Sequence, residues 1–399
     1  MSKFHARTDV GLRRKHNEDS LLAAEEFGVF VVADGVGGRK AGELASAITV
    51  NTYQTFAPRI KQAIDAFAAD SNRDSRNAVL ALLDHAANAA SKRVYEAANA
   101  SGRQGMTTTL VAVAVGGGGA FVCHVGDSRA YLLRQGQLRQ LSEDHSMVNE
   151  LIRTGALAPE DAEKSQYRNV ITRAVGLYPT VRTDTLHVEL VDGDRLLLCT
   201  DGLTDMVPAP LMLKLLGNPN VLQAADTLIA AALERGGKDN VTVLVIDPEA
   251  TLEAEAVAAR ARVMESLFLF EELPFQARLR VGRIVNELFV SPSQLVVKRG
   301  DIGDTLYVVI QGQMSVLVDG VEVACLTEGE HFGELALVDG EPRSADIVAK
   351  GFAHLLCIER EVFREFCLME PTLGNVMLWK LVATLGKRLS VANMKMSGK

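Results

Sequence analysis

The chain has 399 residues, of which 48% are hydrophobic and 23% are charged. This balance is typical of soluble globular proteins with room for two or three buried cores, and it excludes a disordered or collagen-like chain. The formal net charge of −8 lacks the basic excess that nucleic acid or an anionic lipid surface selects. We therefore expect neither nucleic acid nor a membrane as a partner.

The cysteines and the N-terminal residues indicate a compartment. The 5 cysteines form no C-x-x-C pair, which argues against a disulfide framework and against a cysteine-rich zinc site. A reducing environment suits them best. The N-terminal stretch is charged from its third residue and has no apolar core, so it does not read as a signal peptide. These features predict a cytoplasmic protein.

The first part of the chain, to about residue 247, alternates β-rich runs with helical stretches. Strands are predicted at 27–34, 109–115, 120–127, 129–134, 194–201 and 240–247. Two Ala-rich helices are predicted over about 41–66 and 76–100, because their apolar residues recur at three- and four-residue spacing. Sheets covered by packed helices follow, which is an α+β layout.

The second part of the chain has a different pattern. Pro248 ends the last strand, and residues 249–273 contain neither Gly nor Pro, so they favour a helix that would serve as a semi-rigid linker or as the helix of a homodimer. Short strands are predicted at 294–301, 305–312, 313–320, 321–329 and 345–350. Glycine turns between them favour a small barrel or jelly roll, and amphipathic helix follows Glu359.

Acidic residues recur where the predicted strands of the first part end. They are Asp34, Asp127, Asp201 and Asp239, with Glu18 and Asp19 near the N-terminus. One Asp-Gly or Gly-Asp pair is more often a simple turn, so only the whole set indicates a site. Mg2+ and Mn2+ take carboxylate, carbonyl and water ligands, and two such ions can activate a shared water and clamp a phosphoryl group. Arg14 is suited to bind two phosphate oxygens at once.

The acidic motifs stand in a recognisable order. They are R-x-x-N-E-D (Arg14 to Asp19), V-A-D-G-x-G-G (Val32 to Gly38), G-x-T-T (Gly105 to Thr108), G-D-S-R (Gly126 to Arg129), D-G-L (Asp201 to Leu203) and D-N-x-T (Asp239 to Thr242). Over about residues 5–247 the chain resembles the metal-dependent protein serine/threonine phosphatases of the protein phosphatase 2C family, in their bacterial form. The resemblance implies a four-layer αββα sandwich and hydrolysis of phosphoserine and phosphothreonine in proteins by a water that two metal ions activate.

The resemblance also implies roles for residues at the N-terminal side of this site. Asp34 would bridge two Mn2+ or Mg2+ ions and Gly35 would lend its carbonyl oxygen to a metal. Asp19 would hold metal-bound waters. Arg14 would bind the substrate phosphate, so Arg14 and Asp34 are the predicted catalytic residues.

Further roles fall on the later motifs. Asp201 and Asp239 would ligate one of the two metals, and Asp127 would serve a third ion that is found in bacterial relatives. Residues 145–175 match the variable flap that the family places beside its active site. Val36 stands where eukaryotic members often have a histidine proposed as general acid, so the general acid is left unassigned.

A second motif lies at residues 332–345, FGELALVDGEPRSA. A Gly-Glu pair that opens a short helix offers backbone N–H groups to an anion, Arg343 can pair with that anion, and Glu334 can accept hydrogen bonds from sugar hydroxyls. A bare G-E-L would be explained as an ordinary helix start with Arg343 as a surface charge.

The whole string resembles the phosphate-binding cassette of cyclic nucleotide-binding domains, over about residues 265–395. The resemblance implies a β jelly-roll barrel flanked by helices, with Glu334 on the ribose 2′-hydroxyl and Arg343 on the cyclic phosphate. The remaining cassette residues would be Gly333, Leu335, Ala336 and Ser344. The cassette favours cAMP over cGMP, although the Ser344 hydroxyl would also suit cGMP. Trp379 is expected to be buried in the helix core rather than to cap the base.

These features predict a phosphatase domain over 1–247, a helical linker over 248–264 and a cyclic nucleotide-binding domain over 265–399. The predicted function is a Mn2+- or Mg2+-dependent protein serine/threonine phosphatase that cyclic nucleotide regulates. One alternative is a cyclic nucleotide sensor whose phosphatase-like domain only docks partners. Another is a constitutive phosphatase with a structural barrel.

Overall fold

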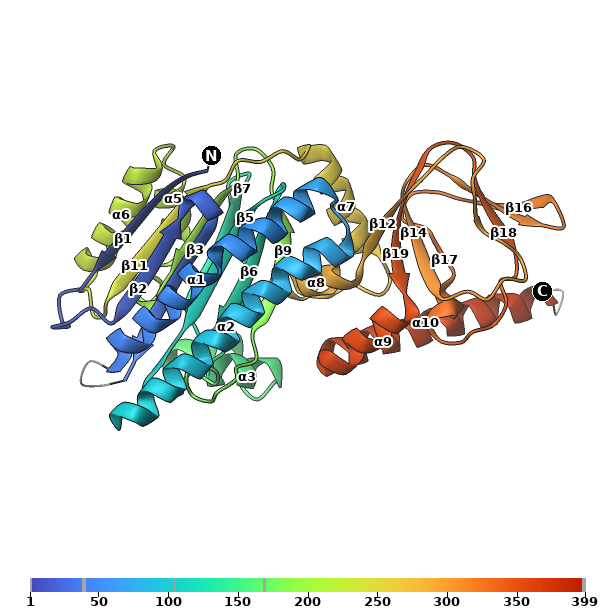
Figure 1. The fold of residues 1–399 in the computed structure, drawn as a ribbon. Coiled ribbons are helices and arrows are strands. Elements are labelled where there is room, and N and C mark those ends of the chain that lie inside the picture. Colours follow the sequence, from blue (N-terminus) through green and yellow to red (C-terminus); the bar gives the residue numbers. More distant parts are fainter. Residues whose placement is uncertain (1, 38–40, 104, 168–169, 397–399) are drawn as a thin grey trace. The chain divides into compact units, whose positions relative to one another are not determined.

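The computed structural model describes residues 2–37, 41–103, 105–167 and 170–396. It divides into two compact units, Met1–Glu253 and Ala254–Lys399, which are described separately (Figure 1). The division falls inside the segment predicted as a linker, of which Ala254–Ser266 is helix α7. Among the described helices, none combines the length and the apolar character needed to cross a membrane.

Two antiparallel sheets form the middle of the first unit. One sheet has the order β1 (Lys3–Asp9), β11 (Val241–Asp247), β10 (Arg195–Cys199), β7 (Arg129–Arg134) and β8 (Gln137–Gln140). The other has the order β2 (Asp19–Ala24), β3 (Val29–Val36), β5 (Leu110–Gly116), β6 (Gly119–Val125) and β9 (Asp184–Glu189), and β4 (Thr107–Thr108) pairs with β3.

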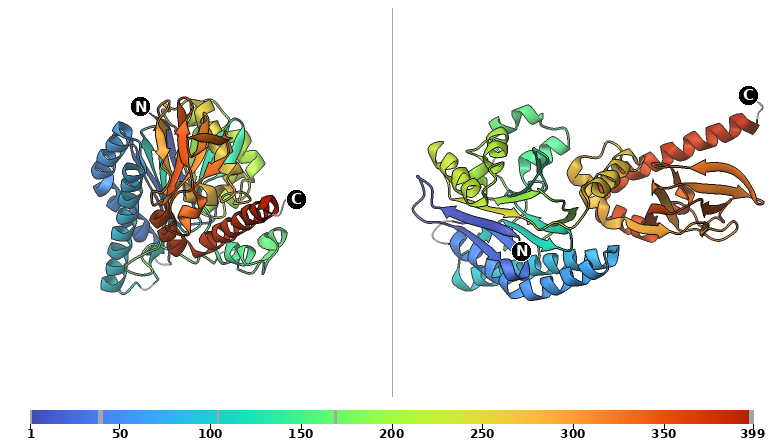
Figure 2. Two further views of the ribbon diagram at one scale, coloured as in Figure 1. Left: turned by 90° about the vertical axis from the view of Figure 1, so that its right-hand side faces the viewer. Right: turned by 90° about the horizontal axis from the view of Figure 1, so that it is seen from above.

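Helices cover the outer face of each sheet. The long helices α1 (Ala41–Ala69) and α2 (Arg73–Ser101) lie side by side on the sheet that contains β3. Helices α5 (Ala209–Leu216) and α6 (Val221–Glu234) cover the other sheet, and the view from above in Figure 2 shows the layers. The predicted four-layer αββα sandwich is therefore confirmed.

Burial on both faces explains the composition of the central strands. All residues of β6 are buried, and in β5 only the terminal Gly116 is half-buried, so these strands are apolar without alternation, apart from the buried His124 of β6. On the helix side, Phe67 of α1 packs edge-on against Phe121 of β6 with 5.2 Å between ring centroids. Asn72 caps α2 through a reciprocal capping box with Ser75.

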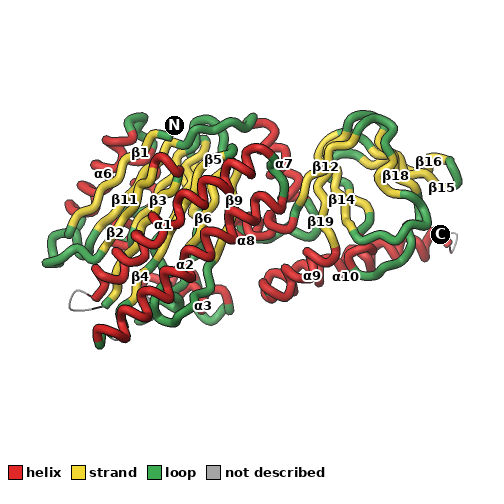
Figure 3. Tube along the Cα trace, in the orientation of Figure 1, coloured by secondary structure: helices red, strands yellow, loops and turns green. Residues whose placement is uncertain are grey.

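Five strands of the first unit were not predicted from the sequence. They are β1, β2, β4, β8 and β9, of which β1, β2, β4 and β9 can be followed in Figure 3. No residue of β1 or β8 is fully buried, and β2 has no regular alternation of buried and exposed residues. Their pairing with apolar neighbours, such as β1 with β11, makes them strands. That pairing joins segments more than two hundred residues apart, so no local pattern announces it.

The second unit is a jelly roll of two four-stranded antiparallel sheets. Their orders are β12 (Asn286–Val290), β19 (Ala353–Glu359), β14 (Thr305–Gln311), β17 (His331–Phe332), and β13 (Leu295–Val297), β18 (Asp346–Ala349), β15 (Met314–Val318), β16 (Val321–Leu326). The predicted jelly roll is confirmed, and its described strands form two sheets rather than a closed barrel.

Helices accompany these sheets in the second unit. They are α7, α8 (Phe275–Val281), α9 (Arg360–Met369) and α10 (Pro371–Met396). The first unit also contains α3 (Met147–Arg153) and α4 (Asp201–Thr204). Short 3-10 turns are η1 (Glu25–Phe27), η2 (Pro159–Lys164), η3 (Gly282–Ile284) and η4 (Glu334–Leu337).

Helix α10 buries a different face from the one expected. Met377 and Leu381, one turn apart, are buried in the core of the second unit. Trp379 is 69% exposed, so the prediction of a buried tryptophan is wrong. Residue 379 is two positions from each buried neighbour and therefore lies on the opposite side of the helix.

A close backbone contact in the first unit yields a stability prediction. A Cβ on Gly42 of α1 would lie 2.5 Å from the carbonyl oxygen of Gly35 in β3. We expect Gly42→Ala to destabilise the first unit by about 1–3 kcal/mol, although Ala normally favours a helix. The matched control is Gly386→Ala in α10, which has open space around its Cβ position and should stabilise by about 0.5–1 kcal/mol. Calorimetric unfolding of the full chain measures both, and an unchanged first unit in Gly42→Ala would contradict the packing argument.

Candidate active site

The centre of the site is a pair of aspartates on adjacent strands. Asp19 at the start of β2 lies directly opposite Asp34 of β3 in the antiparallel register. Like charges facing each other across two strands are unfavourable. Such a pair persists only where something else compensates for the repulsion, which marks the position as functional.

Two threonines fix the backbone of Asp34. The Thr109 hydroxyl accepts a hydrogen bond from the Asp34 amide at 2.9 Å, and the Thr108 hydroxyl donates to the Asp34 carbonyl at 2.7 Å. Thr109 also bonds the Ser128 hydroxyl at 2.7 Å, next to Asp127. Thr109, the residue directly after the G-x-T-T motif, therefore links the strand of Asp34 to the loop of Asp127.

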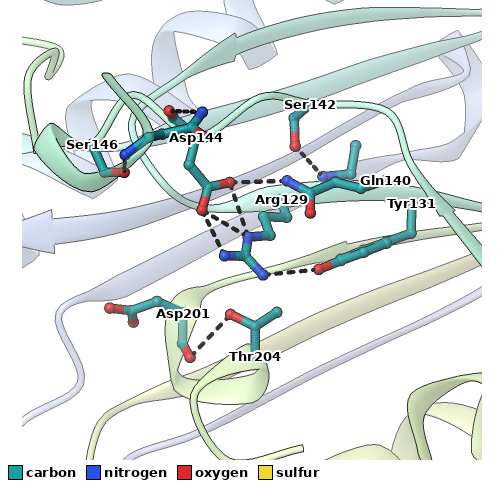
Figure 4. Close-up of polar contacts among 10 residues, drawn as sticks. Arg129, Tyr131, Gln140, Ser142, Asp144, Ser146, Asp201 and Thr204 are labelled. Carbon is teal, nitrogen blue, oxygen red and sulfur yellow. Dashed lines mark hydrogen bonds and ion pairs between the residues drawn. The ribbon is translucent and has the colours of Figure 1, made fainter. Parts of the chain in front are cut away.

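Asp19 is held on one side only. Its Oδ2 accepts hydrogen bonds from the hydroxyls of Thr242 at 2.6 Å and Thr200 at 3.1 Å. Its Oδ1 is buried and has no hydrogen-bond partner among the described residues, and the same holds for Oδ1 of Asp201. Asp201 follows Thr200 and begins α4, where Thr204 bonds its carbonyl oxygen (Figure 4).

Burial and mutual repulsion raise the pKa of these carboxyl groups. Burial is the largest cause for Asp34, whose pKa lies well above its ordinary value, and the charges of Asp19, Asp201 and Asp127 raise it further. Burial raises the pKa of Asp19 to about 7, although the two threonine hydroxyls oppose the shift. Burial followed by the charge of Asp201 raises the pKa of Asp127 to about 7.

Asp201 shares this environment. Burial, then the charges of Asp205 and Asp239, raise its pKa to about 6, and a side-chain hydrogen bond with Asp34 lowers it in part. The structure thus brings together Asp19, Asp34, Asp127, Asp201 and Asp239 as mutually repelling groups. Two of their oxygens have no donor. Cations bound at this cluster would offset the repulsion between its carboxylates.

The donor set fits hard divalent cations. Within the described ranges, no three or more His, Cys, Asp or Glu side chains are already arranged as a metal-binding group. A Mg2+ site needs fewer protein ligands than such a group, because the ion keeps several waters and binds through one or two carboxylates. Orphaned oxygens on buried, crowded carboxylates suit such an ion. The ligand assignments of Asp19, Asp34, Gly35, Asp127, Asp201 and Asp239 stay predictions.

Arg14 lies at the rim of the cluster. Its Nη2 donates to Oδ2 of Asp239 at 2.6 Å, and its side chain is half exposed. The hydrogen bond to Asp239 is the largest cause of its raised pKa, and the charges of Glu18 and Asp34 contribute. The guanidinium is therefore positioned beside the carboxylates and still accessible to a ligand.

Asn240 is a site residue that the sequence reasoning missed. Its amide donates to the carbonyl oxygens of Val10 and His16, each at 2.9 Å, and its Oδ1 accepts from the amide of Glu18 at 2.8 Å. These three bonds close the loop that carries Arg14. The D-N-x-T motif contains the signal, because Asn240 is its second residue.

Arg129 is bound by Asp144 and Tyr131. Its Nε and Nη2 donate to Asp144 at 2.6–3.0 Å, and Nη1 donates to the Tyr131 hydroxyl at 3.1 Å (Figure 4). Gln140 adds a bond to Asp144 at 2.9 Å. The arginine of the G-D-S-R motif thus fixes the segment after β8, and its charge partly opposes the raised pKa of Asp127.

The segment predicted as a flap starts against the Asp127 loop. The His145 amide donates to the Gly126 carbonyl at 2.8 Å, and the Thr172 amide donates to the His145 carbonyl at 2.7 Å. Between them lie α3 and η2, while residues 168–169 are outside the described part. The base of this segment is therefore connected to the candidate site.

In the second unit the structure brings the ends of the predicted cassette together. Gly333 has a φ of 83° and precedes η4, and a Cβ there would lie 2.7 Å from the Thr305 carbonyl oxygen, so this position requires glycine. Arg343 Nη2 donates to that same carbonyl at 2.8 Å. Glu334 and Ala336 are buried, whereas Leu335 and Ser344 are exposed. The binding roles of these residues stay predictions.

Comparison with protein families gives two matches. The model of the family described as Protein phosphatase 2C matches residues 13–235. The model described as Cyclic nucleotide-binding domain matches residues 287–370. Together they cover both units of the chain.

Individual relatives agree with the first match. The serine/threonine phosphatase stp of Listeria monocytogenes is 38% identical over 254 residues, which are 61% of this chain and 95% of the relative. The phosphatase PstP of Mycobacterium tuberculosis is 37% identical over 246 residues, 61% of this chain and 45% of the relative.

Solved structures agree as well. A crystal structure of PstP/Ppp from Mycobacterium tuberculosis has a TM-score of 0.56 at 36% identity and covers 62% of this chain and 99% of that one. The catalytic domain of PstP in complex with 2 manganese ions has a TM-score of 0.53 at 35% identity, over 62% of this chain and 97% of that one.

The raised pKa values yield a pH prediction for metal-free protein. Between the ordinary carboxyl pKa of 3.8 and the raised value of about 7, the folded chain binds more protons at Asp19 and Asp127 than the unfolded chain does. The free energy of unfolding contributed by these groups therefore falls as the pH rises through this window. Since a metal ion competes with those protons, we expect Mn2+ to raise the melting temperature more at about pH 7.5 than at about pH 5. Scanning calorimetry with and without chelator measures this, and an equal or larger gain at the lower pH would contradict it.

Proposed function

The chain belongs to the protein phosphatase 2C family, and we propose that it hydrolyses phosphoserine and phosphothreonine in protein substrates with Mn2+ or Mg2+ as cofactor. The observation that carries the proposal is the buried cluster around Asp19 and Asp34, in which the carboxyl pKa values are raised and two oxygens lack donors. A cluster so costly without cations is explained by metal-dependent chemistry.

The residues at the cluster would hold two metal ions. Asp34, with the Gly35 carbonyl beside it, would bridge them, and Asp201 and Asp239 would ligate one. Asp19 would orient coordinated waters, and Asp127 would serve a third ion. When bound, the ions supply an activated water as nucleophile and neutralise charge on the phosphoryl group. The two manganese ions in the PstP catalytic domain support a metal pair here.

The chain's own residues would orient the substrate. Arg14 would bind two phosphate oxygens through its planar guanidinium, which offsets the repulsion between a phosphate dianion and the carboxylates. Asp239 holds that guanidinium at 2.6 Å, and Asn240 holds both ends of its loop. The loop is therefore pre-organised, so little ordering is needed when phosphate binds.

The second unit supports a regulatory proposal. We propose that cyclic nucleotide, cAMP in preference to cGMP, binds the cassette and changes the phosphatase rate. The family match over 287–370 and the placement of Gly333 against Arg343 support it. Glu334 would accept hydrogen bonds from the neutral ribose, and Arg343 would bind the charged cyclic phosphate.

Replacing the predicted bridging ligand tests the metal mechanism. We expect Asp34→Asn to lower kcat for phosphopeptide hydrolysis in Mn2+ on the order of 10²-fold or more, since the amide loses the negative charge that holds the ions. The control is Asp65→Asn, an exposed aspartate of α1 paired with Lys61. Turnover that survives Asp34→Asn would contradict the mechanism, and a wild-type protein without turnover would favour a docking module.

Replacing the predicted phosphate-binding arginine of the cassette tests regulation. We expect the wild-type rate to change when cAMP or cGMP is titrated and Arg343→Ala to abolish that response, because a desolvated charge pair contributes about 2–5 kcal/mol to binding. Arg364→Ala, on the exposed side of α9, is the control. A wild-type rate that ignores both nucleotides would leave a constitutive phosphatase with a structural jelly roll.

A further inference from the structure

Helix α10 reaches the cyclic nucleotide cassette through one side chain. We propose that Arg388 occupies Glu334 while no ligand is bound, so that the ribose of a cyclic nucleotide binds only after the end of α10 is released. This inference rests on the proposed function of the second unit.

The contacts at Glu334 carry the inference. Arg388 Nη1 donates to Glu334 Oε1, and its Nη2 lies 3.1 Å from Nε2 of His331 and 3.5 Å from the His331 carbonyl oxygen. The Glu334 side chain is 5% exposed, whereas that of Arg388 is 50% exposed. The arginine therefore reaches from the surface to a buried carboxylate at the position where the ribose hydroxyl is expected.

The energetics make the two partners competitors. A buried carboxylate without a partner is costly, and Arg388 satisfies it with a charge-assisted hydrogen bond. A ribose hydroxyl is a neutral donor. When ribose replaces Arg388, the ion pair to Glu334 is therefore exchanged for a weaker hydrogen bond. The free energy gained when the cyclic phosphate binds Arg343 has to offset that loss. Ligand affinity is therefore reduced by the closed state.

The first half of helix α10 packs into the core of the second unit, whereas most of its second half does not. In its first half, Leu373, Met377 and Leu381 are buried, and Lys380 Nζ lies 3.0 Å from Oε2 of Glu272. In the second half, every described side chain from 382 to 390 is exposed or half-buried. Arg388 lies seven residues beyond Leu381, about 10 Å along the helix. Leu385 is half-buried and still packs against the core, so loss of the Arg388 contact would free the part of α10 that follows Leu385 without disturbing the core.

The phosphate side of the cassette is occupied in the same state. Arg343 Nη2 donates to the Thr305 carbonyl at 2.8 Å, so the cyclic phosphate also meets a group that is already engaged. The two contacts differ in consequence. Freeing Arg343 changes a bond within the jelly roll, whereas freeing Glu334 releases a helix. Ribose recognition is thus the step that would be transmitted along α10.

Binding of cAMP and of cGMP to the full chain tests the competition. Calorimetry would compare the wild type with Arg388→Gln and with the control Lys387→Gln, which removes the same charge from the adjacent, exposed position of α10. We expect Arg388→Gln to lower Kd for both nucleotides about tenfold, which corresponds to about 1.4 kcal/mol, because both ligands carry the same ribose. Lys387→Gln should leave Kd unchanged.

The other outcomes overturn the inference in distinguishable ways. An unchanged Kd in Arg388→Gln means that the ion pair does not compete, and a higher Kd means that Arg388 contacts the ligand; in both cases nucleotide binding itself stands. If neither the wild type nor Arg388→Gln binds either nucleotide, the proposed ligand fails as well. Hydrogen exchange without ligand is the second measurement. Residues after Leu385 should exchange faster in Arg388→Gln than in Lys387→Gln, and equal rates would show that the contact does not hold the helix.

Discussion

The opposition of Asp19 and Asp34 across β2 and β3 is the constraint on which the site depends. Burial raises the pKa of both carboxyl groups, and the charges of Asp19, Asp201 and Asp127 raise the pKa of Asp34 further. Hydroxyl groups donate to one oxygen of Asp19, whereas the other has no donor among the residues that the structure describes. Repulsion between these carboxylates therefore lowers the free energy of unfolding of the metal-free chain. Cations bound at the cluster would relieve this repulsion, so the same groups affect both stability and catalysis.

The scaffold around this pair leaves little room for movement. Gly35 and Gly42 approach so closely that neither position accepts a Cβ without displacement of backbone. Thr108 and Thr109 fix the Asp34 peptide on the opposite side. Helix α1 is thereby held directly against the strand that carries the predicted bridging ligand. Rigid placement of this kind keeps repelling groups together, because side chains free to rotate would turn apart.

The second unit uses opposite charges where the first uses like charges. Glu334 is buried and satisfied by Arg388, and Arg343 is satisfied by a backbone carbonyl. Each group already has a partner that a ligand would have to replace. A site built in this way responds to its ligand by releasing protein contacts, and the released contact at Glu334 belongs to a helix.

The sequence by itself determined the two-part organisation, the central apolar strands, the long helices and the order of the acidic and cassette motifs, because these depend on local composition and spacing. The tertiary structure decided the rest. The polar strand β1 exists through pairing with the distant strand β11, and Asn240 reaches a loop more than two hundred residues away. Helix phase, which places Trp379 outside and directs Arg388 onto Glu334, depends on which face the core takes up. Long-range pairing and packing leave no mark at a single position, so only the folded chain shows them.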